Sequence, residues 1–287
     1  MSRPQTLLEL IHAAPADRTA IVLPEQGINV SYAQFREQVQ AMADGLASMG
    51  IQPGDRVATS VPNGLPAIVS FIAASVAGTA APLNPGYREE EVLFYLEDTN
   101  AKVLLVPPDG QEAARKAAEA RGVPVYAIEV DDKGFARIVN APAGKTAAAP
   151  SPDAVALVLH TSGSTGRPKR VPIMHRNLAA STHNIVATYD LKPEDVSMCV
   201  MPLFHVHGLV ASTLSTLLSA GTVVVPAKFN ALTFWRTVRD TKATWYSAVP
   251  TIHNLLLNRA GETRPEGAEQ LRFIRSCSAA LPAEMME

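Results

Sequence analysis

The sequence predicts an α/β protein built from layered, largely parallel sheets that helices cover. Three observations lead to this prediction. Apolar strand-like segments alternate with helix-like segments along most of the chain. The composition, with 47% hydrophobic and 18% charged residues in a chain of 287, is typical of a globular protein large enough for two lobes around a cleft. Finally, a Ser/Thr/Gly-rich stretch directly follows a very apolar strand-like segment, which is where α/β proteins bind ligands.

The first helix is predicted from its capping residues. Ser31 followed three positions later by Gln34 forms a capping box, and apolar residues then recur on one helical face over 35–49 until Gly50 ends the helix. "IQPGDR" then turns the chain into a short strand at 57–60.

A long uncharged run follows, because no charged residue occurs from Val57 to Tyr87. Proline and glycine interrupt the run, so its helical part, 65–77, is shorter than the roughly 20 residues that a bilayer requires. We therefore expect a buried helix and no membrane span.

The alternation continues to the end of the chain. The predicted helices cover 88–98, 111–121, 177–188, 209–219 and 231–241, with another beginning at Pro250. The predicted strands cover 102–106, 123–130, 154–160, 196–201, 222–225, 243–246 and 271–277. The Pro/Ala-rich segment 140–152 is predicted as a surface loop, and 281–287 as the start of a further helix.

Charge and cysteine content exclude several classes of protein. The formal net charge of -2, from 25 basic and 27 acidic residues, provides no electrostatic surface for nucleic acid. Cys199 and Cys277 are too few for a disulfide framework, and the first ten residues lack the apolar core of a secretion signal. These observations favour a cytoplasmic location.

The stretch "HTSGSTGRPKRVP", residues 160–172, has the chemistry of a phosphate-binding loop. Gly163 and Gly166 let the backbone approach a phosphate closely, the neighbouring hydroxyl groups donate hydrogen bonds, and Lys169 adds a positive charge after the rigid Pro168. The spacing matches neither the P-loop of nucleotide hydrolases nor the dinucleotide fingerprint. A polar connector with a chance lysine is the alternative interpretation.

"TSGSTGRPK", residues 161–169, resembles the phosphate-binding signature of the AMP-forming acyl-activating enzymes, which include acyl-CoA synthetases, luciferases and the adenylation domains of peptide synthetases. "MPLFHVHGL" and "SCSAAL" resemble the next motifs of that superfamily in the expected order, and "GDRV", "PLNPGY" and "AKVLLV" resemble its first lobe. Within the superfamily, "ATWYSAVPTIHNLLL" and "LRFIRSCSAAL" are most similar to oxalate-CoA ligases. Arg170 stands where the family usually has glycine.

The resemblance implies a two-step reaction in which ATP activates a carboxylic acid as an acyl-adenylate and coenzyme A then receives the acyl group. The β and γ phosphates would be held by Thr161, Ser162, Gly163, Ser164, Thr165, Gly166 and Lys169. His205 would orient the attacking carboxylate, so that His205 and Lys169 are the implied catalytic residues. The adenine would lie against Ser278, Ala279 and Ala280.

The resemblance also implies that His205 lies beside the acid pocket. His207, Ser247 and Ser276 are assigned to this pocket because a small dicarboxylate needs polar partners for its far carboxylate. Phe234, Trp235 and Trp245 are instead predicted to belong to the core. His205 and His207 lie two residues apart, but the sequence provides no third metal ligand and we assign no metal site.

Several family features are absent from these 287 residues: a glutamate for Mg²⁺, an aspartate for the ribose, and a C-terminal domain with the adenylation lysine. The chain is therefore expected to be a truncated, partial N-terminal AMP-binding domain with little activity alone. By resemblance, residues 1–55 with 190–287 form one lobe and 56–189 the other. The sequence does not predict an oligomeric state.

Three functions are compatible with these observations. The first is an acid-CoA ligase for oxalate or another short acid, using ATP, Mg²⁺ and coenzyme A. The second is an aryl or fatty-acid CoA ligase. The third is a non-catalytic nucleotide-binding protein; a phosphotransferase is disfavoured because Walker-type spacing is absent.

Overall fold

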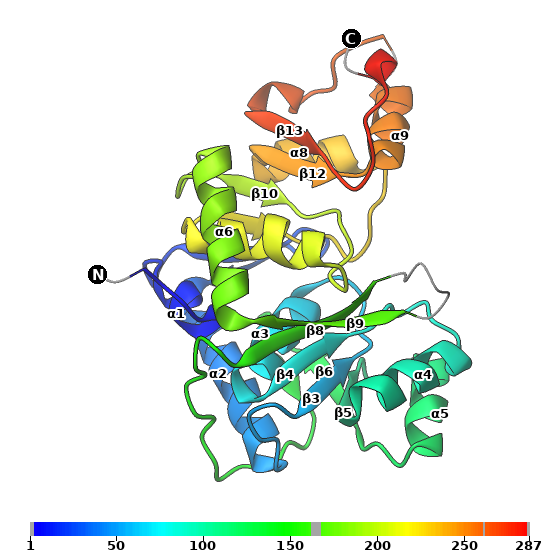
Figure 1. The fold of residues 1–287 in the computed structure, drawn as a ribbon. Helices are drawn as coiled ribbons and strands as arrows, with labels where there is room; N and C mark the ends of the chain where they lie inside the picture. The colour runs from blue at the N-terminus through cyan, green and yellow to red at the C-terminus, as the bar shows by residue number, and fades with distance from the viewer. Residues whose placement is uncertain (1–2, 162–167, 261, 286–287) are drawn as a thin grey trace.

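The computed structural model describes residues 3–161, 168–260 and 262–285, and its strands form two sheets, one above the other in the view of Figure 1. The six-stranded sheet has the order β13-β12-β10-β11-β1-β2 and consists of β1 (Thr19–Leu23), β2 (Ile28–Ser31), β10 (Val196–Met198), β11 (Thr222–Val224), β12 (Trp245–Ala248) and β13 (Phe273–Ser276). The seven-stranded sheet has the order β7-β6-β5-β3-β4-β8-β9 and consists of β3 (Arg56–Thr59), β4 (Thr79–Pro82), β5 (Ala101–Val106), β6 (Val125–Val130), β7 (Ala136–Ile138), β8 (Val155–Thr161) and β9 (Lys169–Met174). The predicted α/β class with parallel sheets is confirmed.

Antiparallel pairs occur only at the sheet edges among the strands described: β2 with β1, β7 with β6, and β9 with β8. The last pair was not predicted, because the sequence analysis assigned no strand between the phosphate loop and the helix after it. Lys169–Met174 instead pairs with β8, in a register that sets Lys169 opposite Thr161. Pro172 is tolerated in β9 because this strand is at the edge of its sheet.

The helices agree closely with the predicted ones. They are α1 (Leu7–His12), α2 (Tyr32–Ser48), α3 (Leu65–Ala77), α4 (Glu89–Thr99), α5 (Glu112–Ala120), α6 (His175–Tyr189), α7 (Ser215–Leu218), α8 (Phe234–Thr241) and α9 (Pro250–Ala260), with a π-helical segment η1 (His207–Leu214) and short 3₁₀ turns at Ala268–Gln270 and Ala283–Met285. The capping box of α2 is present, since the Gln34 N–H donates to Ser31 Oγ and the Ser31 N–H donates to Gln34 Oε1. Helix α1 and the β1–β2 hairpin were not predicted.

Helix α3 is the uncharged segment, and it is almost completely buried against α2 and strands of the seven-stranded sheet. It ends at Gly78, where a Cβ atom would lie 2.5 Å from the backbone oxygen of Asp55, so that only glycine permits this close approach. Among the described residues, no helix has both the length and the apolar character that crossing a membrane requires.

N-terminal and C-terminal parts of the chain contribute to the same sheet, because β1 pairs in parallel with β11, about 200 residues later in the sequence. The Tyr32 hydroxyl also donates to the Gly221 carbonyl, at 2.7 Å. In contrast, α2 packs on α3, and the largest core cluster includes residues of both sheets. The largest cluster thus contains residues of both predicted lobes, 1–55 with 190–287 and 56–189, and the division into these lobes stays a prediction.

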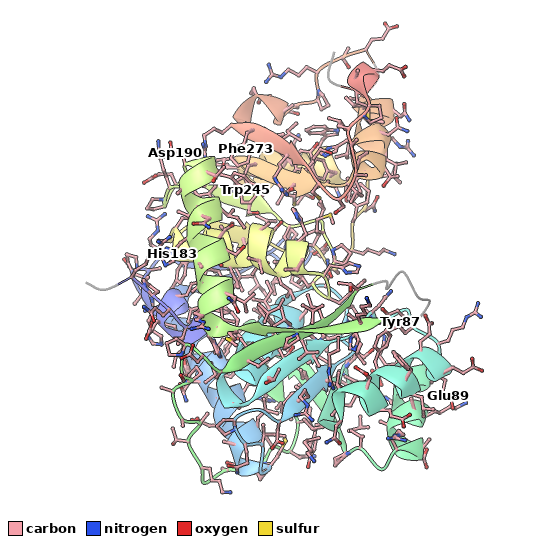
Figure 2. All side chains as sticks on the ribbon, viewed as in Figure 1. Tyr87, Glu89, His183, Asp190, Trp245 and Phe273 are labelled. Atoms are coloured by element: carbon pink, nitrogen blue, oxygen red, sulfur yellow. The ribbon has the colours of Figure 1, made fainter. Side chains whose placement is uncertain are left out.

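Aromatic side chains pack the outer part of the six-stranded sheet. Trp245 and Phe273 stack with ring centroids 5.2 Å apart and lie near Asp190 at the end of α6 (Figure 2). Trp245 and Phe234 are buried as predicted, and Trp235 packs against the same cluster while half-buried. These contacts fix β12 and β13, which carry part of the site described next.

Candidate active site

A cavity of about 880 Å³ opens between the two sheets. Residues at or just beyond the carboxyl ends of β4, β8, β10, β12 and β13 line it, among them Leu83, Thr161, Met201, Val249 and Ser278. Ligands of α/β proteins bind at this edge because the loops that leave parallel strands diverge there. The volume is within the range of small-molecule sites.

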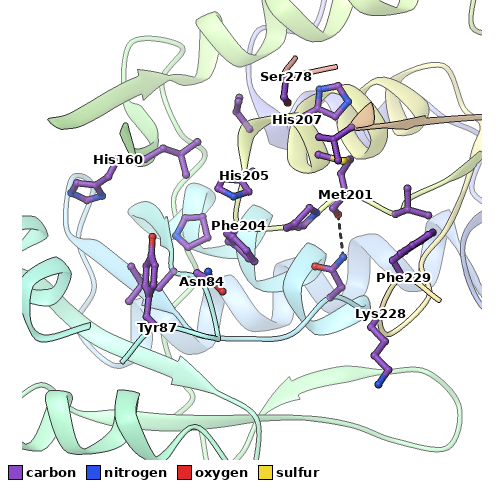
Figure 3. A pocket seen from close by; sticks show the side chains of 18 of the residues that line it. Asn84, Tyr87, His160, Met201, Phe204, His205, His207, Lys228, Phe229 and Ser278 are labelled. Carbon is purple, nitrogen blue, oxygen red and sulfur yellow. Dashed lines mark hydrogen bonds between the residues drawn. The ribbon is translucent and has the colours of Figure 1, made fainter. Parts of the chain in front are cut away.

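The segment from Met201 to η1 carries two of the predicted residues, His205 and His207, into the cavity wall (Figure 3). It folds back sharply, and a Cβ atom on Gly208 would lie 2.4 Å from the backbone oxygen of Pro202. A side chain at position 208 would therefore push the histidines out of place, which explains the glycine of "FHVHGL".

Asn63, which the sequence analysis did not identify, connects this segment to the other sheet. Its amide donates to the Met201 carbonyl at 3.1 Å and accepts from the Leu203 N–H at 2.9 Å. Asn63 lies in the turn between β3 and α3, and its side chain also lines the cavity. Its two hydrogen bonds fix the position of the backbone that carries His205 into the cavity wall. The only sequence feature that pointed to Asn63 was the turn signal "PNG".

His205 lines the cavity and packs beside Phe204, with ring centroids 4.5 Å apart. Partial burial lowers the pKa of the imidazole below its usual range. The ring is therefore neutral at pH 7, and it can donate or accept a hydrogen bond without adding a charge.

His207 forms a cluster with Ser247 and Arg275. Its Nε2 lies 2.8 Å from Ser247 Oγ, and Arg275 Nη1 lies 3.2 Å from both ring nitrogens. Burial, with a contribution from the Arg275 charge, lowers the pKa of His207 to about 4. His207 and Ser247 were predicted from the sequence, whereas Arg275, which faces them from the neighbouring strand β13, was not.

This pKa predicts how stability depends on pH. The folded chain holds His207 neutral down to about pH 4, whereas the unfolded chain binds a proton near pH 6.5, so His207 costs stability as pH falls from 6.5 toward 4. Between pH 7 and pH 5 the free energy of unfolding should therefore fall by on the order of 1–2 kcal/mol less when His207 is replaced with glutamine. Urea unfolding of both forms at pH 7 and pH 5 measures it. Curves that lose stability equally between the two pH values would contradict the assignment.

One side of the cavity is bordered by the β8–β9 pair, whose strands flank the predicted phosphate loop. Thr161 lines the cavity, and Lys169 lies exposed opposite it on β9. Side chains of directly paired residues project from the same face of a sheet, so Lys169 projects on the cavity side of the pair. The predicted residues Ser162, Gly163, Ser164, Thr165 and Gly166 lie outside the described residues.

Arg170, the departure from the family pattern, has a structural partner. Its guanidinium donates to the Asp98 backbone oxygen and lies 3.9 Å from the Asp98 carboxylate. That carboxylate also contacts His160 Nε2, at 2.9 Å. Arg170 thus ties β9 to the carboxyl end of α4, where a positive charge is favourable.

The loop after β13 is only partly at the cavity. Ser278 lines it and has a φ of +67°, whereas Ala279 and Ala280 are exposed and are not among the lining residues. Ser276 is not a lining residue either, and its hydroxyl is buried without a partner among the described residues. Ser247 is not a lining residue, and it is connected to the cavity through its hydrogen bond with His207.

The described wall of the cavity carries no acidic side chain. Its described lining includes His160, His205, His207 and Lys228, but no aspartate or glutamate. Nowhere in the described residues do three or more His, Cys, Asp or Glu side chains gather in a way that would hold a metal ion. The residues at hand therefore do not form a Mg²⁺ site, and we derive no step through that ion.

Two sheets with a cavity at the carboxyl ends of their strands, bordered by the strands that flank the predicted phosphate loop, define an α/β ligand-binding domain. A family model described as "AMP-binding enzyme" matches residues 9–287. The chain belongs to this family.

Relatives and solved structures agree with this membership. The chain is 40% identical over 285 residues to an oxalate–CoA ligase of Arabidopsis thaliana, covering 96% of the chain and 55% of the relative. It is 32% identical over 289 residues to a sulfoacetate–CoA ligase of Cupriavidus necator, covering 97% and 56%. The crystal structure of apo MatB from Rhodopseudomonas palustris superposes with a TM-score of 0.84 at 26% identity, over 98% of the chain and 56% of MatB. The chain thus spans about half the length of the relatives it matches.

Proposed function

We propose that the chain binds ATP and a small carboxylic acid in an AMP-forming acid–CoA ligase, with oxalate as the first candidate acid. The observation that carries the proposal is the single cavity that His205, His207 and Thr161 share. Oxalate and sulfoacetate, after which two of the relatives are named, are both small acids with a second anionic group.

The proposed reaction has two steps, and in each step one bond forms as another breaks. A carboxylate oxygen of the acid attacks the α-phosphorus of ATP, and the bond to the β-phosphate oxygen breaks, releasing pyrophosphate. The thiol of coenzyme A then gives its proton to solvent and its sulfur attacks the acyl carbon, and the bond from that carbon to the phosphate oxygen breaks, so that AMP leaves with this oxygen. Both steps depend mainly on positioning and on neutralising phosphate charge.

Each residue has a limited task in this scheme. Lys169 and the 161–166 loop hold the β and γ phosphates, which the β8–β9 register supports by directing Lys169 to the cavity side. Neutral His205 donates a hydrogen bond that orients the attacking carboxylate. Ser278 and the small residues after it border the adenine, and coenzyme A enters the same cavity once pyrophosphate has left.

We also keep a cytoplasmic location as part of the proposal. Cys199 and Cys277 are both unpaired and buried, as expected for a protein kept in a reducing compartment.

The test is ATP/pyrophosphate exchange on the product of the whole reading frame that contains these residues, with the 287-residue chain alongside. The acids offered are oxalate, malonate, a cinnamate-type acid, a medium-chain fatty acid, and none. We expect exchange driven by oxalate in the longer product and little in the chain alone. Exchange with the cinnamate or the fatty acid only would establish the aryl or fatty-acid alternative, which the aromatic cavity residues Tyr87, Phe204 and Phe229 favour. ATP binding without exchange would indicate a non-catalytic nucleotide-binding protein.

A further inference from the structure

Arg275 is a half-buried cation that lacks an acidic partner among the described residues. Its Nη1 lies 3.4 Å from Ser247 Oγ and its guanidinium carbon lies 5.6 Å from the centre of the Tyr189 ring. Its Nε and Nη2 groups donate to no described residue. A guanidinium keeps its charge at any ordinary pH, and a partly buried charge without a counter-ion is unfavourable. The site around Arg275 is therefore incomplete without an anion.

The geometry at His207 shows how Arg275 is held. An N–H that points along a ring lone pair lies close to one nitrogen, but Arg275 Nη1 is 3.2 Å from both Nδ1 and Nε2. Equal distances place Nη1 over the face of the imidazole, where it does not consume the hydrogen-bonding capacity of the ring. His207 Nε2 remains bonded to Ser247, and the ring itself lines the cavity.

The positive charge at this end of the cavity belongs to Arg275 and not to His207. The imidazole is neutral at pH 7, because its pKa is about 4. Lys228 also lines the cavity, but it is exposed and its ammonium group points away from His207 (Figure 3). An acid that carries its second anionic group next to His207 would find its compensating charge directly behind the ring.

We propose that Arg275 is the specificity-determining residue that selects small acids with a second anionic group, by compensating that group beside His207. This inference rests on the proposed function, since it assumes that the acid binds in this cavity. The acid reacts through one carboxylate with ATP, so the other stays charged and must be held in a partly dehydrated site. Arg275 is not itself a lining residue of the cavity, so its permanent charge compensates the carboxylate from behind the His207 ring.

The experiment compares wild type with Arg275→Met and Arg275→Lys in the whole reading-frame product, using oxalate and the size-matched monoanion glycolate in the exchange assay. In Arg275→Met we expect the ratio of kcat/KM for oxalate to that for glycolate to fall at least about 30-fold, mainly through the KM for oxalate. Arg275→Lys should recover part of the ratio, and the KM for ATP should stay unchanged. Arg137→Met is the matched control, because Arg137 is an exposed arginine paired with Glu129 on the far edge of the other sheet.

The outcomes separate the inference from the proposed function. Equal losses with oxalate and glycolate, or an unchanged ratio, would overturn the role of Arg275 while leaving the ligase intact. A wild type that prefers glycolate would also overturn it. If no acid supports exchange, the proposed function fails, and calorimetric titration of oxalate into the wild-type and Arg275→Met chains then decides the inference alone: binding lost in the variant supports it, and equal or absent binding rejects it.

Discussion

Replacing Arg272 with methionine should lower the free energy of unfolding by on the order of 3 kcal/mol, near the lower end for a broken buried ion pair, because Asp195 is buried whereas the Arg272 side chain is 37% exposed. Asp195 is 4% exposed, and its carboxylate accepts from Arg272 Nη2 at 2.7 Å and from Arg272 Nε at 3.1 Å. The variant leaves this buried carboxylate with the Thr244 hydroxyl and the Lys192 N–H as its remaining donors. An uncompensated buried charge is the largest part of the expected cost.

The loss should extend beyond one side chain, because Arg272 also donates to the carbonyl groups of Tyr189 and Asp190. These contacts join the end of α6 to the beginning of β13. Urea unfolding followed by circular dichroism measures the effect, with Arg137→Met as the exposed control, expected to cost less than about 1 kcal/mol. Adding Asp195→Asn to Arg272→Met should recover part of the stability. A loss below about 1 kcal/mol in Arg272→Met would show that water compensates Asp195 in the folded chain.

Local signals were sufficient to predict most of the elements. The capping box at Ser31 and Gln34 defined α2 because both partners lie within one helical turn. The interruptions around the uncharged run identified α3 as a buried helix, and the structure places it in the core. The parallel class followed from the alternation of strands and helices, which only a covered sheet accommodates.

The elements that were missed depend on distant partners. The first four residues of strand β9 are exposed and one of them is a proline, and the segment is a strand only because β8 offers an edge for pairing. The β1–β2 hairpin belongs to a sheet whose other strands lie more than 150 residues away in sequence. Such pairings leave little trace in the segment itself.

The residues of the candidate site also fall into those that a local motif predicted and those whose roles depend on distant contacts. His205 and His207 were recognised because one short motif carries both. Asn63 and Arg275 were missed because their roles arise from contacts with residues 138 and 68 positions away, respectively. Arg170, which seemed only a departure from a glycine pattern, is explained by Asp98, 72 positions earlier.

Lys169→Ala should weaken ATP binding by about 100-fold or more if Lys169 is the main cation for the β and γ phosphates. The β8–β9 register sets Lys169 opposite Thr161, whose side chain lines the cavity, so the Lys169 side chain projects on the cavity side of the edge strand. The measurement is calorimetric titration of ATP into the wild-type and variant chains at low and at moderate salt.

Lys116→Ala is the matched control, because Lys116 is an exposed lysine on α5 and its removal changes the net charge equally. A loss of affinity in Lys169→Ala that Lys116→Ala does not share would assign the effect to the phosphate site and not to the overall charge. Lys169→Arg should retain much of the affinity, since the charge is kept. The salt dependence of ATP binding should also be weaker in Lys169→Ala, because one ionic contact has been removed. Equal ATP affinity in wild type and Lys169→Ala would mean that other donors hold the phosphates, and the role assigned to Lys169 would be withdrawn.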